Sequence, residues 1–150
     1  MRTNRPELYY HMVISTKDRK PWIVPEIEDR IWSCLDRIAR ENEIAPLQIG
    51  GDDDHVHLLL GVPPTIPIDK VAQLIKEESA AWIHDTFPDL QPFAWQDGYG
   101  AFTVSESSVP EVRAFILNQR DHHRVVAFET EYLLILRMHE IPFDERSVFD

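Results

Sequence analysis

Two histidines placed one residue apart are the first residues in this sequence whose type and spacing suggest chemistry. His55 and His57 stand in GGDDDHVHLLL (residues 50–60), after three aspartates and before three leucines. In a strand, residues i and i+2 project to the same face, so the two imidazoles would lie side by side. Neutral imidazoles on a rigid strand suit a divalent cation. A metal site needs at least a third ligand, and without one the pair is more simply two half-exposed strand histidines.

A candidate for that third ligand lies in VRAFILNQRDHH (residues 112–123). Phe115, Gln119 and His123 are spaced four residues apart, so they share one stripe of a helix. The amide oxygen of Gln119 suits a hard cation such as Mg²⁺ or Mn²⁺. His123 would lie beside the ligands, contact a phosphate, or stabilise the C-terminal half of the helix. The alternative is that the stripe is the solvated face of an amphipathic helix.

Eight elements are expected to position these residues. Apolar and β-branched runs predict strands over residues 8–15, 46–51, 55–62 and 98–105. Apolar residues at three- and four-residue spacing, with capping signals such as Ser107-Ser108 before Pro110, predict four helices. These helices span residues 26–43, 69–87, 108–126 and 129–139.

The order β-α-β-β-α-β-α-α predicts an α+β fold of the ferredoxin-like, split βαβ type. Such a fold has an antiparallel sheet with helices on one face, here followed by C-terminal helices that carry part of the site. Alternation along residues 55–62 places Val56, Leu58 and Leu60 on the helix-covered face. The two histidines are therefore expected on the uncovered face. The plan hosts many functions and assigns none by itself.

Length and composition indicate a single domain over residues 1–150. Apolar residues make up 43% and charged residues 27% of the chain, which is ordinary for a globular protein. No apolar run is long enough to span a membrane, and no signal-peptide core follows the N-terminus. The single cysteine, Cys34, excludes an internal disulfide, fits a reducing compartment and is expected to be a buried thiol. We expect a cytoplasmic protein.

The charge distribution bears on nucleic-acid binding. The net charge of −11 argues against sequence-blind binding, which needs many contacts between basic residues and phosphates. Residues 1–40 nevertheless hold eight of the fifteen basic residues against six acids, so a local basic face is possible. Recognition of a shaped DNA end fits this balance better than long-range electrostatic capture.

Together the motifs resemble a known family. GGDDDHVHLLL, the upstream STKDRKPWI, the middle LIKEESAAWI, the DGYGAFTVSES strand and VRAFILNQRDHH occur in the order and spacing of the single-tyrosine transposases of the HUH endonuclease superfamily. These are small enzymes of bacterial insertion sequences that move as single-stranded DNA. The resemblance covers about residues 7–146. It implies that His55, His57 and Gln119 hold a divalent metal, Mg²⁺ or Mn²⁺, and that the protein is a homodimer with shared active sites.

The resemblance also implies a reaction, and the sequence departs from it at one position. In that family a tyrosine four residues before the glutamine attacks the scissile phosphate, forms a 5′-phosphotyrosine link and frees a 3′-hydroxyl. Here that position is Phe115, which has no oxygen. Two explanations are that the chain carries a deliberate Tyr→Phe substitution and that it is a natural relative that binds hairpins without cutting. A third option is another tyrosine, although none of the four stands at that spacing; they are Tyr9, Tyr10, Tyr99 and Tyr132.

The remaining candidates are basic or aromatic. By the resemblance, Lys17, Arg19, Lys20 and Lys76 contact DNA phosphates; otherwise they belong to a solvated turn and a helix surface. Trp82 and Trp95 are expected to be packing residues. The function favoured is DNA transposition by metal-dependent nicking and rejoining of single-stranded DNA, with single-stranded or hairpin DNA as partner. The alternatives are a non-catalytic hairpin-binding relative with a vestigial metal site and, with less support, a metal enzyme acting on a small molecule.

Overall fold

A computed structural model of the protein describes residues 8–150. These residues contain one antiparallel sheet. Its strands are β1 (Tyr9–Ser15), β2 (Ala45–Asp52), β3 (His55–Gly61) and β4 (Gly100–Val104). They are ordered β2-β3-β1-β4, and every neighbouring pair is antiparallel. This is the ferredoxin-like arrangement that the sequence predicts, and each strand begins and ends within two residues of its prediction.

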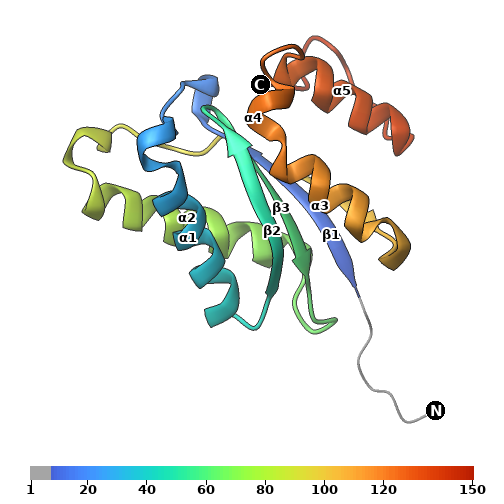
Figure 1. The fold of residues 1–150 in the computed structure, drawn as a ribbon, viewed down its shortest axis with the longest axis horizontal. Coiled ribbons are helices and arrows are strands. Elements are labelled where there is room, and N and C mark those ends of the chain that lie inside the picture. Colours follow the sequence, from blue (N-terminus) through green and yellow to red (C-terminus); the bar gives the residue numbers. More distant parts are fainter. Residues whose placement is uncertain (1–7) are drawn as a thin grey trace.

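Helices α1 (Pro25–Glu41) and α2 (Ile68–Thr86) cover one face of the sheet (Figure 1). The cross-strand pairs Met12↔Leu58 and Ile14↔Val56 point toward these helices, and all four side chains are at most 1% exposed. Burial of such apolar area is the main stabilising contribution to a domain of this size. The leucine-bearing side of β3 is therefore the core side, as alternation predicts.

The opposite face is covered by the C-terminal helices, which differ from prediction in extent. They are α3 (Val109–Leu117), α4 (Gln119–His122) and α5 (Phe128–Met138) (Figure 1). The expected helix over residues 108–126 is instead two helices divided at Asn118, whose ψ of 17° departs from helical geometry. The N–H of Asn118 still donates to Ala114 O at 3.2 Å, so α4 continues roughly in the direction of α3. Three short 3₁₀ turns complete the described elements; they are Lys17–Arg19, Pro88–Leu90 and Glu106–Ser108.

The expectation that His55 and His57 lie on an uncovered face of the sheet is wrong, because the C-terminal helices cover this face. Both side chains are fully buried. Two glycines allow the helices to lie this close. A Cβ at Gly50 would come within 2.6 Å of the carbonyl oxygen of Ile116 on α3, and one at Gly100 within 2.4 Å of the hydroxyl oxygen of Tyr132 on α5. The architecture is thus helix, sheet, helix.

Several other predictions are confirmed by burial. Cys34 is 4% exposed within α1. Trp95 lies in the core, where its indole N–H donates to Ser79 Oγ at 2.9 Å, and Trp82 packs edge-on against Phe87. Both tryptophans are packing residues. Within residues 8–150, no helix has the length and apolar character needed to cross a bilayer.

Candidate metal centre

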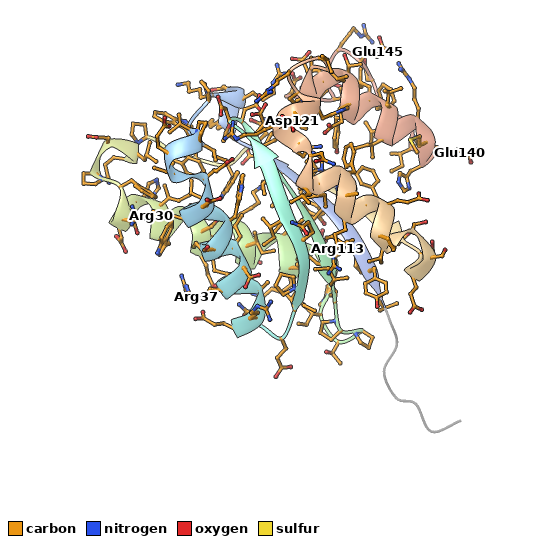
Figure 2. The ribbon with its side chains drawn as sticks, viewed as in Figure 1. Arg30, Arg37, Arg113, Asp121, Glu140 and Glu145 are labelled. Carbon is orange, nitrogen blue, oxygen red and sulfur yellow. The ribbon has the colours of Figure 1, made fainter. Side chains whose placement is uncertain are left out.

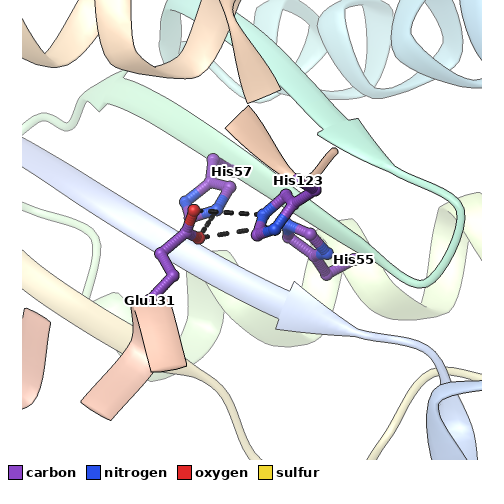
Figure 3. A group of neighbouring side chains, drawn as sticks. All are labelled: His55, His57, His123 and Glu131. Carbon is purple, nitrogen blue, oxygen red and sulfur yellow. Dashed lines mark hydrogen bonds and ion pairs between the residues drawn. The ribbon is translucent and has the colours of Figure 1, made fainter. Parts of the chain in front are cut away.

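Four buried side chains converge between the sheet and the C-terminal helices. His55 and His57 come from β3, His123 from the end of α4, and Glu131 from α5. The possible ligand atoms of these four residues all lie within 4.8 Å of one another. Figure 3 shows the three imidazoles and the carboxylate pointing into the same small space. The arrangement has the donor types of a metal centre.

The Glu131 carboxylate bridges the histidines. Its Oε1 lies 2.8 Å from His57 Nε2, and its Oε2 lies 3.0 Å from His123 Nε2 (Figure 3). The same Oε2 lies 2.9 Å from His122 Nε2. Glu131 was not singled out from the sequence. The available signal was an acid on the apolar side of an amphipathic helix, since Phe128, Glu131 and Leu136 are the buried residues of α5.

Gln119 completes the group and lies where its helical stripe predicts. Its side-chain oxygen is 2.9 Å from both His55 Nε2 and His123 Nε2, and its amide nitrogen donates to Glu131 Oε2 at 3.1 Å. The residue is 1% exposed. The predicted trio of His55, His57 and Gln119 is therefore brought together within one chain.

The outer nitrogen of each imidazole has its own partner. His55 Nδ1 lies 2.8 Å from Asp54 Oδ1, and His123 Nδ1 donates to the carbonyl oxygen of Val126 at 2.6 Å. His57 Nδ1 lies 2.7 Å from Nε2 of His11 on β1. Such outer contacts fix ring orientation and leave the Nε2 atoms facing inward. His11 was not singled out from the sequence, although it shares a sheet face with Val13 and hence with the paired His57.

The electrostatics favour a neutral His57 and a neutral His11 beside an ionised Glu131 carboxylate. Burial lowers the pKa of His57 to about 4 and that of His11 to about 3. For Glu131, burial opposes ionisation, but its hydrogen bonds to His123 and His57 hold its pKa well below the usual range. Burial likewise opposes charging of His123, and its bonds to Glu131 and Val126 outweigh this and raise its pKa. A neutral imidazole and an ionised carboxylate are the forms that bind metals, so His57 and Glu131 already have them, and a metal bound at His123 would displace its proton.

The Phe115 ring packs edge-on against three histidine rings beside the centre. Its ring centroid is 5.4 Å from that of His57, 6.1 Å from that of His11 and 5.6 Å from that of His122. Tyr132 packs among Phe102 and Phe128, and burial raises its pKa, which disfavours the phenolate.

The basic candidates lie around the loop that precedes β4. The N–H of Lys17 donates to Ala94 O at 2.9 Å, and the ammonium of Lys76 donates to Gly98 O at 3.0 Å. Lys20 follows at the end of the same 3₁₀ turn. Arg19 forms an ion pair with Glu129 and lies over the Phe149 ring. Their proposed phosphate contacts stay predictions.

A cavity of about 210 Å³ adjoins this loop and the histidine-bearing face of the sheet. Val13 and Ser15 line it, and their cross-strand partners on β3 are His57 and His55. Aromatic and polar side chains make up the rest of the wall, among them Arg19, Asp97, Tyr132 and Phe149.

Arg120 ties the centre to the hairpin that carries the histidines. Its guanidinium donates to Glu28 Oε2 at 2.6 Å, to Asp52 Oδ1 at 2.8 Å and to Asp53 Oδ1 at 2.7 Å. A fourth bond reaches Ile23 O at 3.0 Å. Two of the three aspartates before the histidines therefore hold α4 against the β2–β3 hairpin.

The arginines of the helices on the two sides of the sheet are separate. Arg30 and Arg37 lie on α1, away from Arg113 of α3 (Figure 2).

Comparison with known proteins gives a consistent set of relatives. The family described as IS200-like transposases matches residues 4–119. The ISDra2 transposase TnpA of Deinococcus radiodurans is 29% identical over 120 residues, covering 77% of this chain and 86% of that protein. The transposase of the IS200 element of Salmonella typhimurium is 23% identical over 121 residues, covering 77% of this chain and 79% of the relative.

Two solved structures share the fold. A crystal structure of a Deinococcus radiodurans protein described as a transposase has a TM-score of 0.66 and 31% identity, covering 79% of this chain and 98% of that chain. A REP-associated tyrosine transposase, determined bound to a REP hairpin, has a TM-score of 0.61 at 12% identity, covering 84% of this chain and 74% of that chain.

Proposed function

We propose, from the premise that this chain belongs to the IS200-like transposase family, that it binds single-stranded or hairpin DNA at the sheet face bearing the histidines and acts in DNA transposition. Both curated transposases and the hairpin-bound structural relative support this function. The cavity beside the centre, with its aromatic and polar walls, suits an unstacked base. A cytoplasmic location belongs to the same proposal.

The metal part of the proposal assigns His55, His57 and Gln119 as ligands of a divalent cation. All three are buried, and their donor atoms face one another. A bound dication would polarise the scissile phosphate and offset charge on the departing oxygen. Lys17, Arg19, Lys20 and Lys76 would position the DNA backbone near this point.

The observation that carries the mechanism is the position of Phe115. Its ring packs against His57, one turn before Gln119, where the nucleophilic tyrosine of the family would stand. Without a hydroxyl the chain forms no phosphotyrosine link, so we propose that it is cleavage-deficient as written. Binding of hairpin DNA would remain, because that function needs no nucleophile.

The test is Phe115→Tyr, with Leu117→Tyr as the matched control on the same helix. Leu117 is 70% exposed and points away from the centre. With Mg²⁺, Mn²⁺, Co²⁺ and Zn²⁺ supplied in parallel, we expect Phe115→Tyr to nick single-stranded DNA with at least one of these dications. It should also form a covalent adduct visible by denaturing electrophoresis. The tyrosine oxygen bonds to phosphorus as the 3′-oxygen leaves and takes up a proton. Leu117→Tyr should do neither. An equal result for the two variants would contradict the assignment.

Phe115 also supports a second candidate function, hairpin binding without catalysis. Phe115 together with the net charge of −11 fits a non-catalytic hairpin-binding protein whose metal centre is vestigial. If Phe115→Tyr stays inert while both proteins bind hairpins equally, this alternative is the correct one.

Sharing of active sites in a homodimer is the last part of the proposal. The segment 109–123 packs on the sheet of its own chain, and exchange between two chains would reproduce the same contacts. Exposed apolar residues on and beyond this segment, Leu117 and Val125, would then meet a partner. Mixing the chain as it stands with the double variant Phe115→Tyr/His57→Ala tests this. Nicking by the mixture requires that one chain supply the tyrosine and the other the metal ligands; no nicking indicates that each site is built within one chain.

A further inference from the structure

We propose that His123 and Glu131 ligate the metal together with His55 and His57, so that the centre selects a first-row transition dication such as Zn²⁺ over Mg²⁺. The inference rests on the proposed function for the role of the centre in DNA chemistry. It goes further by naming two ligands and the class of metal. Metal binding can be measured without DNA, so the two can fail separately.

The hydrogen-bond partners of His55 and His123 support a metal bound at their Nε2 atoms. Their outer Nδ1 atoms face the Asp54 carboxylate at 2.8 Å and the Val126 carbonyl at 2.6 Å, and both of these partners only accept. Each Nδ1 therefore carries the proton. A neutral imidazole with a proton on Nδ1 presents a lone pair at Nε2. Both inward Nε2 atoms are thus acceptors when the rings are neutral.

The atoms that face these lone pairs are acceptors as well. His55 Nε2 and His123 Nε2 both lie 2.9 Å from the side-chain oxygen of Gln119, and His123 Nε2 lies 3.0 Å from Glu131 Oε2. The Gln119 amide nitrogen is turned to Glu131, which fixes its oxygen toward the histidines. Buried acceptors that face one another without a donor are destabilising. A cation among them satisfies all of these atoms at once.

His57 joins the same set. Its Nε2 lies 2.8 Å from Glu131 Oε1, and its Nδ1 shares a contact of 2.7 Å with His11 Nε2. When Nδ1 of His57 donates to His11, Nε2 of His57 is again an inward lone pair. Three imidazole nitrogens and one carboxylate then surround a common point, with ligand atoms no more than 4.8 Å apart.

The donor set and the burial together decide the class of metal. Imidazoles suit Zn²⁺ and other transition dications, whereas Mg²⁺ prefers oxygen ligands and keeps several of its waters. Here His55 and His57 are fully buried, and the side chains of Glu131 and His123 are 3% and 4% exposed. Burial of the ligands separates the centre from the solvent that would supply the waters of Mg²⁺. A site with three nitrogen ligands would also bind Co²⁺ more tightly than Mn²⁺.

The experiment measures Co²⁺ and Zn²⁺ binding by the purified protein without DNA. Variants are Glu131→Gln and His123→Ala, with His122→Ala as the matched control. His122 touches the same carboxylate oxygen at 2.9 Å but lies outside the cluster and is 31% exposed. We expect the first two variants to lose more than about 100-fold in Zn²⁺ affinity. The control should lose no more than the roughly 10–100-fold typical of residues that only orient a ligand.

A spectroscopic count of ligands separates binding from orientation. Pulsed electron paramagnetic resonance of the bound Co²⁺ should report three imidazole nitrogens in the parent chain and in His122→Ala. It should report two in His123→Ala. Millimolar Mg²⁺ should not displace Co²⁺. The proposal is overturned if His123→Ala and Glu131→Gln keep the parent spectrum and affinity, or if Mg²⁺ competes on equal terms. Circular dichroism of each variant establishes that it is folded. Hairpin binding in chelator, measured on the same proteins, tests the proposed function independently.

Discussion

Removal of the Arg120 guanidinium should destabilise the protein more than removal of any exposed arginine. Arg120 donates one hydrogen bond to each of three carboxylates, on Glu28, Asp52 and Asp53, and a fourth to Ile23 O. The substitution Arg120→Met keeps much of the side-chain length and removes all four bonds. It also leaves three acids close together without their common cation.

The magnitude follows from the exposure of each partner. Arg120 is 27% exposed, and Glu28, Asp52 and Asp53 are 20%, 27% and 42% exposed. A charged hydrogen bond that is well shielded contributes about 1.5–3 kcal/mol, and an exposed ion pair about 0–1 kcal/mol. These partly exposed bonds fall between those limits, so we expect a loss of roughly 3 kcal/mol. For a chain of this size that corresponds to a fall in Tm of about 6–12 °C.

Urea denaturation followed by circular dichroism, in the presence of chelator, measures the effect. The control is Arg124→Met, because the Arg124–Asp121 pair is 78% and 74% exposed and its loss should change stability by less than about 0.5 kcal/mol. A double-mutant cycle with Glu28→Gln should show coupling between Arg120 and Glu28. If Arg120→Met is as stable as the control, Arg120 does not tie α4 to the hairpin and our account of how Gln119 is positioned fails.

Two further predictions concern packing and pH. Gly50→Ala should cost about 1–3 kcal/mol and weaken metal binding, because its Cβ would come within 2.6 Å of Ile116 O and displace α3; unchanged urea midpoint and metal affinity would show that α3 adjusts freely. In chelator, stability should fall as pH decreases from 6.5 toward 4, because folding lowers the pKa of His57 to about 4 and of His11 to about 3, so the unfolded chain binds more protons. His11→Gln should flatten that part of the pH profile, whereas a profile that is already flat in the parent chain would contradict the assigned direction.

Local sequence patterns were sufficient to predict the four strands of the sheet and the helices α1 and α2. Strand alternation separates Leu58 and Leu60 from the two histidines whatever the rest of the fold does, because successive side chains point to opposite faces. Helical periodicity likewise places Phe115, Gln119 and His123 on one stripe. The structure keeps both relationships. Gln119 contacts His55 from a helix that packs on the histidine-bearing face of the sheet.

Other features depend on packing between distant segments, and here local patterns were insufficient. The histidine-bearing face was expected to be open, yet α3, α4 and α5 cover it. Glu131 was overlooked because no motif or spacing relates an acid on the last helix to a strand more than seventy residues earlier. The helix over residues 108–126 was too long in prediction, because the chain is divided at Asn118 and the second helix ends at His122.

The sequence by itself determined which residues share a face and that the nucleophile position, Phe115, has no oxygen. These properties follow from chain geometry and residue identity, and need no knowledge of the distant contacts. Only the tertiary structure decided that the face would be buried and that Glu131 would stand among the histidines. Burial and the approach of separate elements depend on how whole helices pack on the sheet, which no local pattern specifies. That packing converts two neighbouring histidines into a candidate four-residue metal centre.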